Sequence, residues 1–242
     1  VYGFFNKWFH TDAPKEEVKE VAYTKEPDEK LLFLTGGKTP DSPVSRDGLI
    51  QYLKRQARKG LIAAKPTDAK SLKRYQKKMR LAWERTLQLP VGPLKVLSEK
   101  LGQAENGGLT VTHLALGLDG YGNRVPAIQF APKGGAKNWA VVVHPQGKGA
   151  LLGSDDVPTG LAKAMLEQGV GVVLADLFLT GELINEAVAA KRDLNRSFFS
   201  VYNRTDLQER VNDLAAVTGY TRKLGDKLIL AGVGRAGLWV QS

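Results

Sequence analysis

The sequence predicts an α/β protein with a mostly parallel sheet, preceded by a β-hairpin and a helical segment. Three continuous apolar runs carry the prediction of the sheet, at residues 139–143, 171–176 and 227–232. Runs of this kind are typical of strands that are buried on both faces. Expected helices at residues 161–168 and 207–224, each followed by a glycine, separate the runs, and this spacing favours right-handed parallel crossovers.

The hairpin is expected directly ahead of the buried strands. Residues 109–116 and 124–132 have the composition of strands, and residues 119–123 between them contain an Asp-Gly pair and a Gly-Asn pair. Such pairs favour a tight turn between two antiparallel strands.

The chain ahead of the hairpin is divided into two zones. Residues 1–44 open with an aromatic segment, 2–9, that needs a partner surface. We interpret this zone as the tail and exit linker of a preceding domain; the alternative is a helix that docks on the main body. Residues 45–102 are expected to form a basic helical connector that begins at the N-cap residue Ser45, and residues 103–242 form the α/β domain.

The composition narrows the function classes. With 43% hydrophobic and 25% charged residues, the chain resembles an average globular protein. No apolar run approaches the roughly 18 residues that span a bilayer, so no membrane partner is expected. The absence of cysteine excludes disulfides and thiolate chemistry. His10, His113 and His144 lack metal-ligand spacing, so we expect neither a metal nor a cofactor.

The net charge of +10 first suggests nucleic acid as a partner. The basic residues, however, concentrate in the helical connector between Arg46 and Lys100. They lack the interleaved aromatic and glycine residues of single-strand binders. A solvated helix face is the interpretation we adopt, and no nucleic-acid partner is expected.

The most informative motif follows the last buried strand. There a turn of small residues, Gly232-Val233-Gly234-Arg235-Ala236-Gly237, leads at once into an expected helix. Two known motifs have this arrangement of a strand, a turn of small residues and a helix. One is the dinucleotide-binding turn, G-x-G-x-x-G. The other is the nucleophile elbow, G-x-S-x-G, in which small residues permit a strained strand-to-helix turn.

The position of the turn in the chain favours the elbow. A dinucleotide-binding turn normally opens the first strand–helix–strand unit, whereas this turn follows two crossovers. In the elbow alignment Gly232 and Ala236 flank Gly234, which stands where the serine would be. Because glycine has no side chain to act as a nucleophile, we predict a close-packed turn with elbow geometry and no catalytic residue.

Further cleft residues are expected at the carboxyl ends of the other buried strands, where ligands bind in open α/β sheets. His144 ends the first run, and Gln146 and Gly147 after it are candidate N–H donors to an oxyanion. The alternative is a plain strand-end turn in which His144 bonds to backbone. Asp176 ends the second run and is expected mainly to accept N–H bonds from loops. Arg235, in the elbow-like turn, is the remaining cleft candidate.

These segments resemble the acetylxylan-esterase-like and prolyl-oligopeptidase-like α/β hydrolases. The resemblance covers roughly residues 75–242. It rests on the hairpin, the loop at residues 144–147, the segment at residues 175–182 and the elbow-like turn.

The resemblance implies the first half of an α/β-hydrolase domain, from a carboxylic-ester hydrolase with a serine acyl-enzyme mechanism. Its substrates would be acetylated carbohydrates or similar esters, and its triad would lie outside this chain. The rest of the same polypeptide, or a second chain, would complete the sheet. The helix at residues 2–9 resembles the last helix of a hydrolase domain, which suggests a tandem esterase with a degenerate second copy. The resemblance also favours export.

Other function classes stay open. A non-catalytic α/β module could bind a protein or polysaccharide partner, and a nucleotide-binding oxidoreductase could use Gly232, Gly234 and Gly237. Nucleic-acid binding through the basic helices would show strongly salt-dependent affinity.

Overall fold

A computed structural model describes residues 2–9, 22–31, 44–89, 92–194, 196 and 198–241. The chain divides into two compact units, Val1–Lys65 and Pro66–Ser242. Among the described helices, none has the length and apolar character required to cross a bilayer.

The first unit contains three separate helices, α1 (Tyr2–Phe9), α2 (Asp28–Leu31) and α3 (Arg46–Ala63). Helix α3 begins as predicted, because the Ser45 hydroxyl accepts a hydrogen bond of 3.0 Å from the backbone N–H of Gly48. Most of the predicted tail and linker lies outside the described residues. That these residues end a preceding domain stays a prediction.

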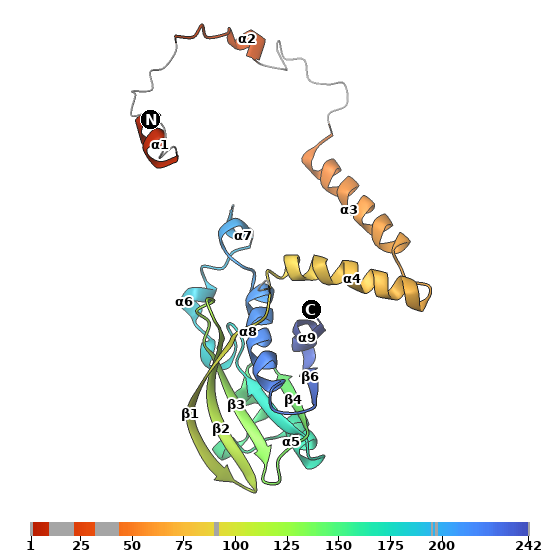
Figure 1. The fold of residues 1–242 in the computed structure, drawn as a ribbon, viewed down its shortest axis with the longest axis vertical. Helices are drawn as coiled ribbons and strands as arrows, with labels where there is room; N and C mark the ends of the chain where they lie inside the picture. The colour runs from red at the N-terminus through yellow and green to blue at the C-terminus, as the bar shows by residue number, and fades with distance from the viewer. Residues whose placement is uncertain are drawn as a thin grey trace. The chain divides into compact units, whose positions relative to one another are not determined.

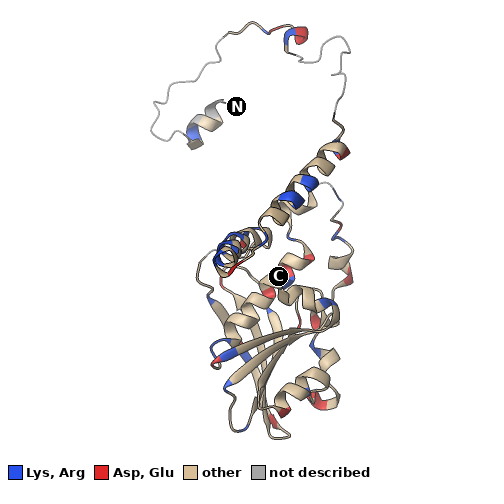
Figure 2. Ribbon diagram, turned by 90° about the vertical axis from the view of Figure 1, so that its right-hand side faces the viewer, with Lys and Arg blue, Asp and Glu red and all other residues tan. Residues whose placement is uncertain are grey.

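The second unit opens with α4 (Ala69–Thr86), whose start is fixed by a capping box between Asp68 and Ser71. Figure 2 shows Lys and Arg along α3 and α4, where the sequence concentrates its positive charge. The prediction that the helical connector extends to residue 102 is wrong. Residues Val96–Asn106 form a strand, β1, which pairs along its length with β2.

The sheet has six strands in the order β1-β2-β3-β5-β4-β6 (Figure 1). The strands after β1 are β2 (Leu109–Leu118), β3 (Val125–Pro132), β4 (Asn138–Val143), β5 (Gly171–Ala175) and β6 (Lys227–Gly232). Strands β1, β2, β3 and β5 pair antiparallel in turn, whereas β5, β4 and β6 are parallel. The predicted α/β architecture, the hairpin and the three strands are confirmed. Strands β4 and β5 are buried as predicted, whereas β6 is exposed or half-buried because it lies at the edge of the described sheet. The sheet is mixed rather than mostly parallel, since β1 adds an antiparallel strand and β3 pairs antiparallel with β5.

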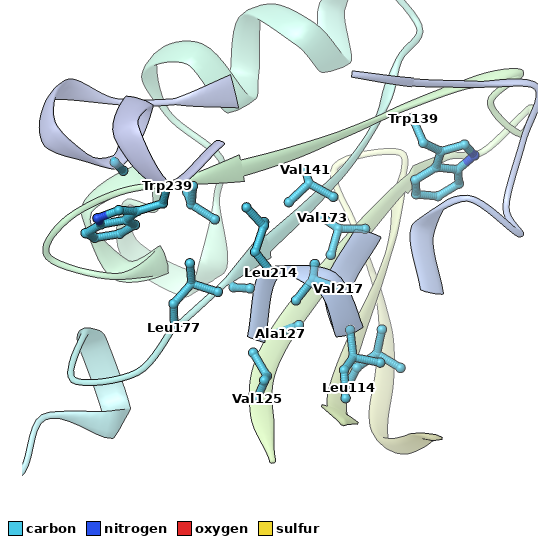
Figure 3. Packing of buried hydrophobic residues seen from close by; sticks show 14 residues of the cluster. Leu114, Val125, Ala127, Trp139, Val141, Val173, Leu177, Leu214, Val217 and Trp239 are labelled. Carbon is cyan, nitrogen blue, oxygen red and sulfur yellow. The ribbon is translucent and has the colours of Figure 1, made fainter. Parts of the chain in front are cut away.

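Helices cover both faces of the sheet. The crossover helices α5 (Gly160–Glu167) and α8 (Asp206–Thr221) confirm the two predicted between the buried strands. Side chains alternate along each strand, so Val141 and Val173 pack with α8 residues such as Leu214, as Figure 3 shows. Their neighbours on the strands pack on the opposite face, where α5 contributes Ala162.

Seven short helices lie between or after these elements. They are η2 (Lys148–Leu151), η3 (Ser154–Asp156), η4 (Gly181–Leu183), α6 (Glu186–Ala189), α7 (Phe199–Tyr202), η5 (Gly234–Ala236) and α9 (Gly237–Gln241).

Candidate functional site

The turn after β6 has the predicted strand-to-helix geometry. Gly234 has a φ of +54°, in the left-handed region that side chains other than glycine adopt at a cost, and a Cβ built there would meet no atom within 4 Å. A Cβ on Gly232 would instead lie 2.3 Å from the backbone oxygen of Ala236. Gly232 therefore permits the close packing of the turn. Gly234 supplies the strained backbone of an elbow, with open space where a nucleophile would project.

The elbow lies beside the end of β4. The N–H of Val233 donates to the carbonyl of Val143 at 3.0 Å, and the N–H of Ala236 donates back to the carbonyl of Val233 at 3.0 Å. The loop that follows β4 therefore begins directly next to the turn that follows β6.

The loop after β4 forms the strand-end turn that was the alternative to an oxyanion loop. The N–H of Gln146 donates to Nδ1 of His144 at 3.2 Å, and the N–H of Gly147 donates to the His144 carbonyl at 2.9 Å. Both candidate donors are therefore satisfied within the loop. An oxyanion could use the Gln146 N–H only if the imidazole turned away, so that role stays a prediction.

Asp176 organises the loops at the ends of β4 and β5. Its carboxylate accepts the N–H of Lys148 at 2.6 Å, the N–H of Glu182 at 3.0 Å and the Lys148 ammonium at 2.6 Å. Asp176 is only 1% exposed and Lys148 only 6%. The ammonium also pairs with the Glu182 carboxylate. The expected loop-organising contacts of Asp176 are present, and because they occupy its carboxylate, a second role in the cleft stays a prediction.

Two glycines make this arrangement possible. A Cβ on Gly147 would lie 2.4 Å from Oδ1 of Asp176, and a Cβ on Gly181 would lie 2.2 Å from the same oxygen. Both glycines have a positive φ, +87° and +50° respectively. The sequence analysis missed Lys148, although a lysine between two glycines at the end of a buried strand is a pattern that could have suggested it.

Asp213 is a second buried acid that the sequence analysis missed. It lies on α8 and accepts hydrogen bonds from the side-chain amide of Asn123, at 3.0 Å, and from the N–H of Phe178, at 2.8 Å. Burial raises the pKa of Asp213 from its usual value to about 6. It joins the hairpin turn, α8 and the loop after β5.

Arginines gather around the start of α8 and the elbow. Arg210 donates from Nε to the Phe178 carbonyl at 3.0 Å, and its guanidinium lies over the ring of Trp239 at 4.9 Å. Burial lowers the pKa of Arg210, and the positive charge of the exposed Arg235 lowers it further. The cleft candidate Arg235 thus joins a cluster of cations rather than the Asp176 loops.

The structure therefore brings the predicted residues together in two groups. His144, Gln146 and Gly147 lie on one loop that contacts Asp176, while Gly234 and Arg235 lie in the adjacent elbow. In the described part of the chain, no three metal-ligating side chains come together.

Comparison with known proteins finds solved structures with a similar fold. No family model and no curated protein sequence matches the chain. Among solved structures, a protein from Bacteroides fragilis that is provisionally named an acetyl xylan esterase superposes with a TM-score of 0.58 at 14% identity, over 82% of this chain and 57% of its own. The chain thus spans little more than half the length of that structure.

Two further structures are similar over shorter stretches. Glucuronoyl esterase from Solibacter usitatus has a TM-score of 0.49 at 16% identity and is matched over 72% of this chain and 56% of its own. Acetyl xylan esterase 1 from Thermoanaerobacterium has a TM-score of 0.44 at 16% identity, over 66% and 52%. At these identities the likeness concerns the fold, and this chain has the mixed-sheet α/β-hydrolase-like architecture of the Bacteroides fragilis structure.

Proposed function

We propose that this chain is part of a carboxylic-ester hydrolase whose catalytic triad lies outside these residues. The enzyme would act on acetylated carbohydrates or similar esters by a serine acyl-enzyme mechanism. The observation that carries the proposal is the turn at Gly234, which combines an elbow backbone with open space and no side chain. An acyl-enzyme needs an oxygen nucleophile at that point, so the chemistry must be supplied elsewhere.

The loop after β4 also supports a catalytic site outside these residues. An oxyanion hole needs N–H groups that point at an empty position. Here the N–H groups of Gln146 and Gly147 are both bonded to His144. This segment accordingly has neither a nucleophile nor free donors at the equivalent loop, as expected of a degenerate copy in a tandem esterase.

We further propose that another part of the same polypeptide, or a second chain, completes the sheet beside β6. Over the described residues β6 is an edge strand that pairs with β4 alone. Ile229 is 40% exposed and Leu230 is 39% exposed, and neighbouring residues on a strand point to opposite faces. An unpaired edge with apolar side chains exposed on both faces favours the addition of a strand together with covering helices.

The N-terminal helix supports a domain ahead of the connector. Phe4, Phe5, Trp8 and Phe9 are all more than half exposed on α1. So much aromatic surface favours a partner, and we propose a preceding hydrolase domain as that partner.

A serine-reactive fluorophosphonate probe tests the proposal. The 242-residue chain should give no adduct by intact-mass measurement. The protein isolated from its source should give one adduct, on a serine outside these residues. An adduct on the 242-residue chain would contradict the placement of the triad. A source protein that is no longer than this chain and unreactive would contradict the ester-hydrolase proposal itself.

The second candidate is a non-catalytic α/β module that binds a protein or polysaccharide. The same two observations favour it, the missing side chain at Gly234 and the occupied N–H groups after β4. This candidate would be favoured over the ester-hydrolase proposal if the isolated protein had no esterase activity on acetylated xylan and bound to insoluble xylan in a pull-down.

A further inference from the structure

A cavity of about 660 Å³ lies between α5 and the turn that joins β1 to β2. Its apolar lining includes Leu109 and Val111 on β2, Leu166 on α5 and Val157 in the loop ahead of α5. Val111 is buried and belongs to the core beneath α5, against which Leu109 and Leu166 pack. Ligand sites are typically concave, mostly apolar and of about 300–1,000 Å³, so this cavity has the size and the lining to hold a small organic molecule.

The cavity is separate from the elbow. Leu109 pairs with Pro132 on β3. On the same strand, Phe130 pairs with Val172 near the start of β5. The cavity therefore reaches the amino ends of the parallel strands, whereas Gly234 follows the carboxyl end of β6. A ligand held there would lie apart from the elbow, whatever reaction the parent protein performs.

The loop that walls one side of the cavity is fixed by two contacts with the hairpin of β1 and β2. Asn106 donates from Nδ2 to the carbonyl of Asp155 at 3.0 Å. Nε2 of His113 lies 3.4 Å from Oδ2 of Asp156. Both aspartates have a positive φ, 56° and 55°, a conformation that costs free energy outside glycine and persists where surrounding contacts hold it. The wall is therefore in place before a ligand arrives, which reduces the ordering cost of binding.

The charges that line the cavity favour a cation. Lys163 and Glu167 both line it, and their side chains pair at 3.8 Å, so their charges offset each other. Asp156 is the remaining charged side chain of the lining, and the imidazole of His113 offsets its carboxylate only when that imidazole is protonated. The lining thus holds one unbalanced negative charge beside an apolar floor, although the chain as a whole has a net charge of +10.

We propose that this cavity binds an organic cation, a molecule with an apolar body and one ammonium group. The body would lie on Leu109, Val111 and Leu166, and the ammonium would pair with the Asp156 carboxylate, which is 42% exposed. Because a partly exposed ion pair contributes modestly, burial of the apolar body would supply most of the affinity. Asp156 would supply the selectivity for positive charge.

Three probes that share a phenylpropyl body test the site, and they are phenylpropylamine, phenylpropanol and phenylpropanoate. Each is titrated into the isotope-labelled 242-residue chain at low ionic strength and followed by the backbone amide signals in NMR spectra. We expect the shifts to centre on Gly107, Thr159 and Lys163, with a dissociation constant of about 1 mM or tighter for the amine. The alcohol should bind at least about twofold more weakly than the amine, and the carboxylate more weakly still.

The order of the three affinities decides between a local site and general charge attraction. The net charge of +10 attracts anions, so non-specific binding predicts that the carboxylate binds best. That order, or an amine that binds no more tightly than the alcohol, would overturn the proposal. Failure of the amine to saturate the shifts below about 10 mM would overturn it as well.

Substitutions locate the site. Asp156→Asn should bring the affinity for the amine to that for the alcohol, and asparagine tolerates the positive φ at this position. Asp155→Asn is the matched control, since it removes the same charge from the same loop at a residue outside the cavity lining. Val157→Trp should fill the cavity and weaken all three probes at least about tenfold, whereas Val188→Trp, at a valine of similar exposure on α6, should not. Equal effects of Asp155→Asn and Asp156→Asn, or unchanged binding in Val157→Trp, would show that the probes bind elsewhere.

Discussion

Replacing each of two glycines in the elbow by alanine should separate the roles that the structure gives them. At Gly234 the new Cβ meets no atom within 4 Å, so the cost is conformational. The φ of +54° places alanine in the left-handed region, at a cost of about 1–2 kcal/mol. At Gly232 the new Cβ would lie 2.3 Å from the oxygen of Ala236 and 2.5 Å from the nitrogen of Gly237.

The contacts at Gly232 involve backbone atoms, which cannot rotate away as a side chain can. Relief requires the start of α9 to move off β6 and to disturb the packing of the buried Trp239. Overpacking of this kind costs about 3 kcal/mol or more when the neighbours are rigid. Gly232→Ala should therefore be more destabilising than Gly234→Ala by at least about 1 kcal/mol, or roughly 2–4 °C in Tm for a domain of this size.

Urea unfolding followed by tryptophan fluorescence measures both variants against the unmodified chain, with Trp239 next to the substitutions. If Gly234→Ala proves equal to or worse than Gly232→Ala, the assignment of close packing to Gly232 and open space to Gly234 is wrong.

Three further predictions concern buried charges and ligands. Because burial raises the pKa of Asp213 from 3.8 to about 6, the folded state binds this proton more tightly than the unfolded state. Its contribution to the free energy of unfolding should fall by about 2 kcal/mol between pH 4 and pH 6, and Asp213→Asn should remove that slope in urea titrations. Parallel pH dependences of the variant and the unmodified chain would refute the assignment. Lys148→Met leaves the Asp176 carboxylate buried without its cation and should cost about 3–5 kcal/mol. Adding Asp176→Asn to Lys148→Met should recover part of that loss of stability in thermal melts. If the destabilising effects of the two substitutions simply add, an unpaired buried carboxylate is not the cause of the loss. Finally, NAD and NADP should leave Tm unchanged, since the Gly232–Gly237 turn is explained by packing; a clear rise with either would favour the oxidoreductase alternative.

The elements that could be predicted from the sequence are those whose cause is local. The runs that became β4 and β5 are apolar throughout because both of their faces are buried, and that property is visible without knowledge of the partners. The run that became β6 is apolar as well, although it lies at the partly exposed edge of the described sheet. The cap at Ser45 and the turn around Gly234 were likewise predictable, because a short side chain or a missing Cβ acts on adjacent backbone. The prediction that this turn carries no nucleophile followed from one residue, Gly234.

Other features depended on contacts between residues far apart in the chain. Strand β1 is almost entirely exposed and therefore lacks an apolar alternation, so its conformation is decided by hydrogen bonds to β2. Nothing in the sequence around Lys148 or Asp213 identifies their partners, because a buried charge is tolerated only once distant groups such as Asp176 or Phe178 are in place. The sequence by itself determined which segments are strands, helices and turns at the core. Only the tertiary structure decided which N–H groups and charges are already satisfied, because that depends on loops brought together at one end of the sheet.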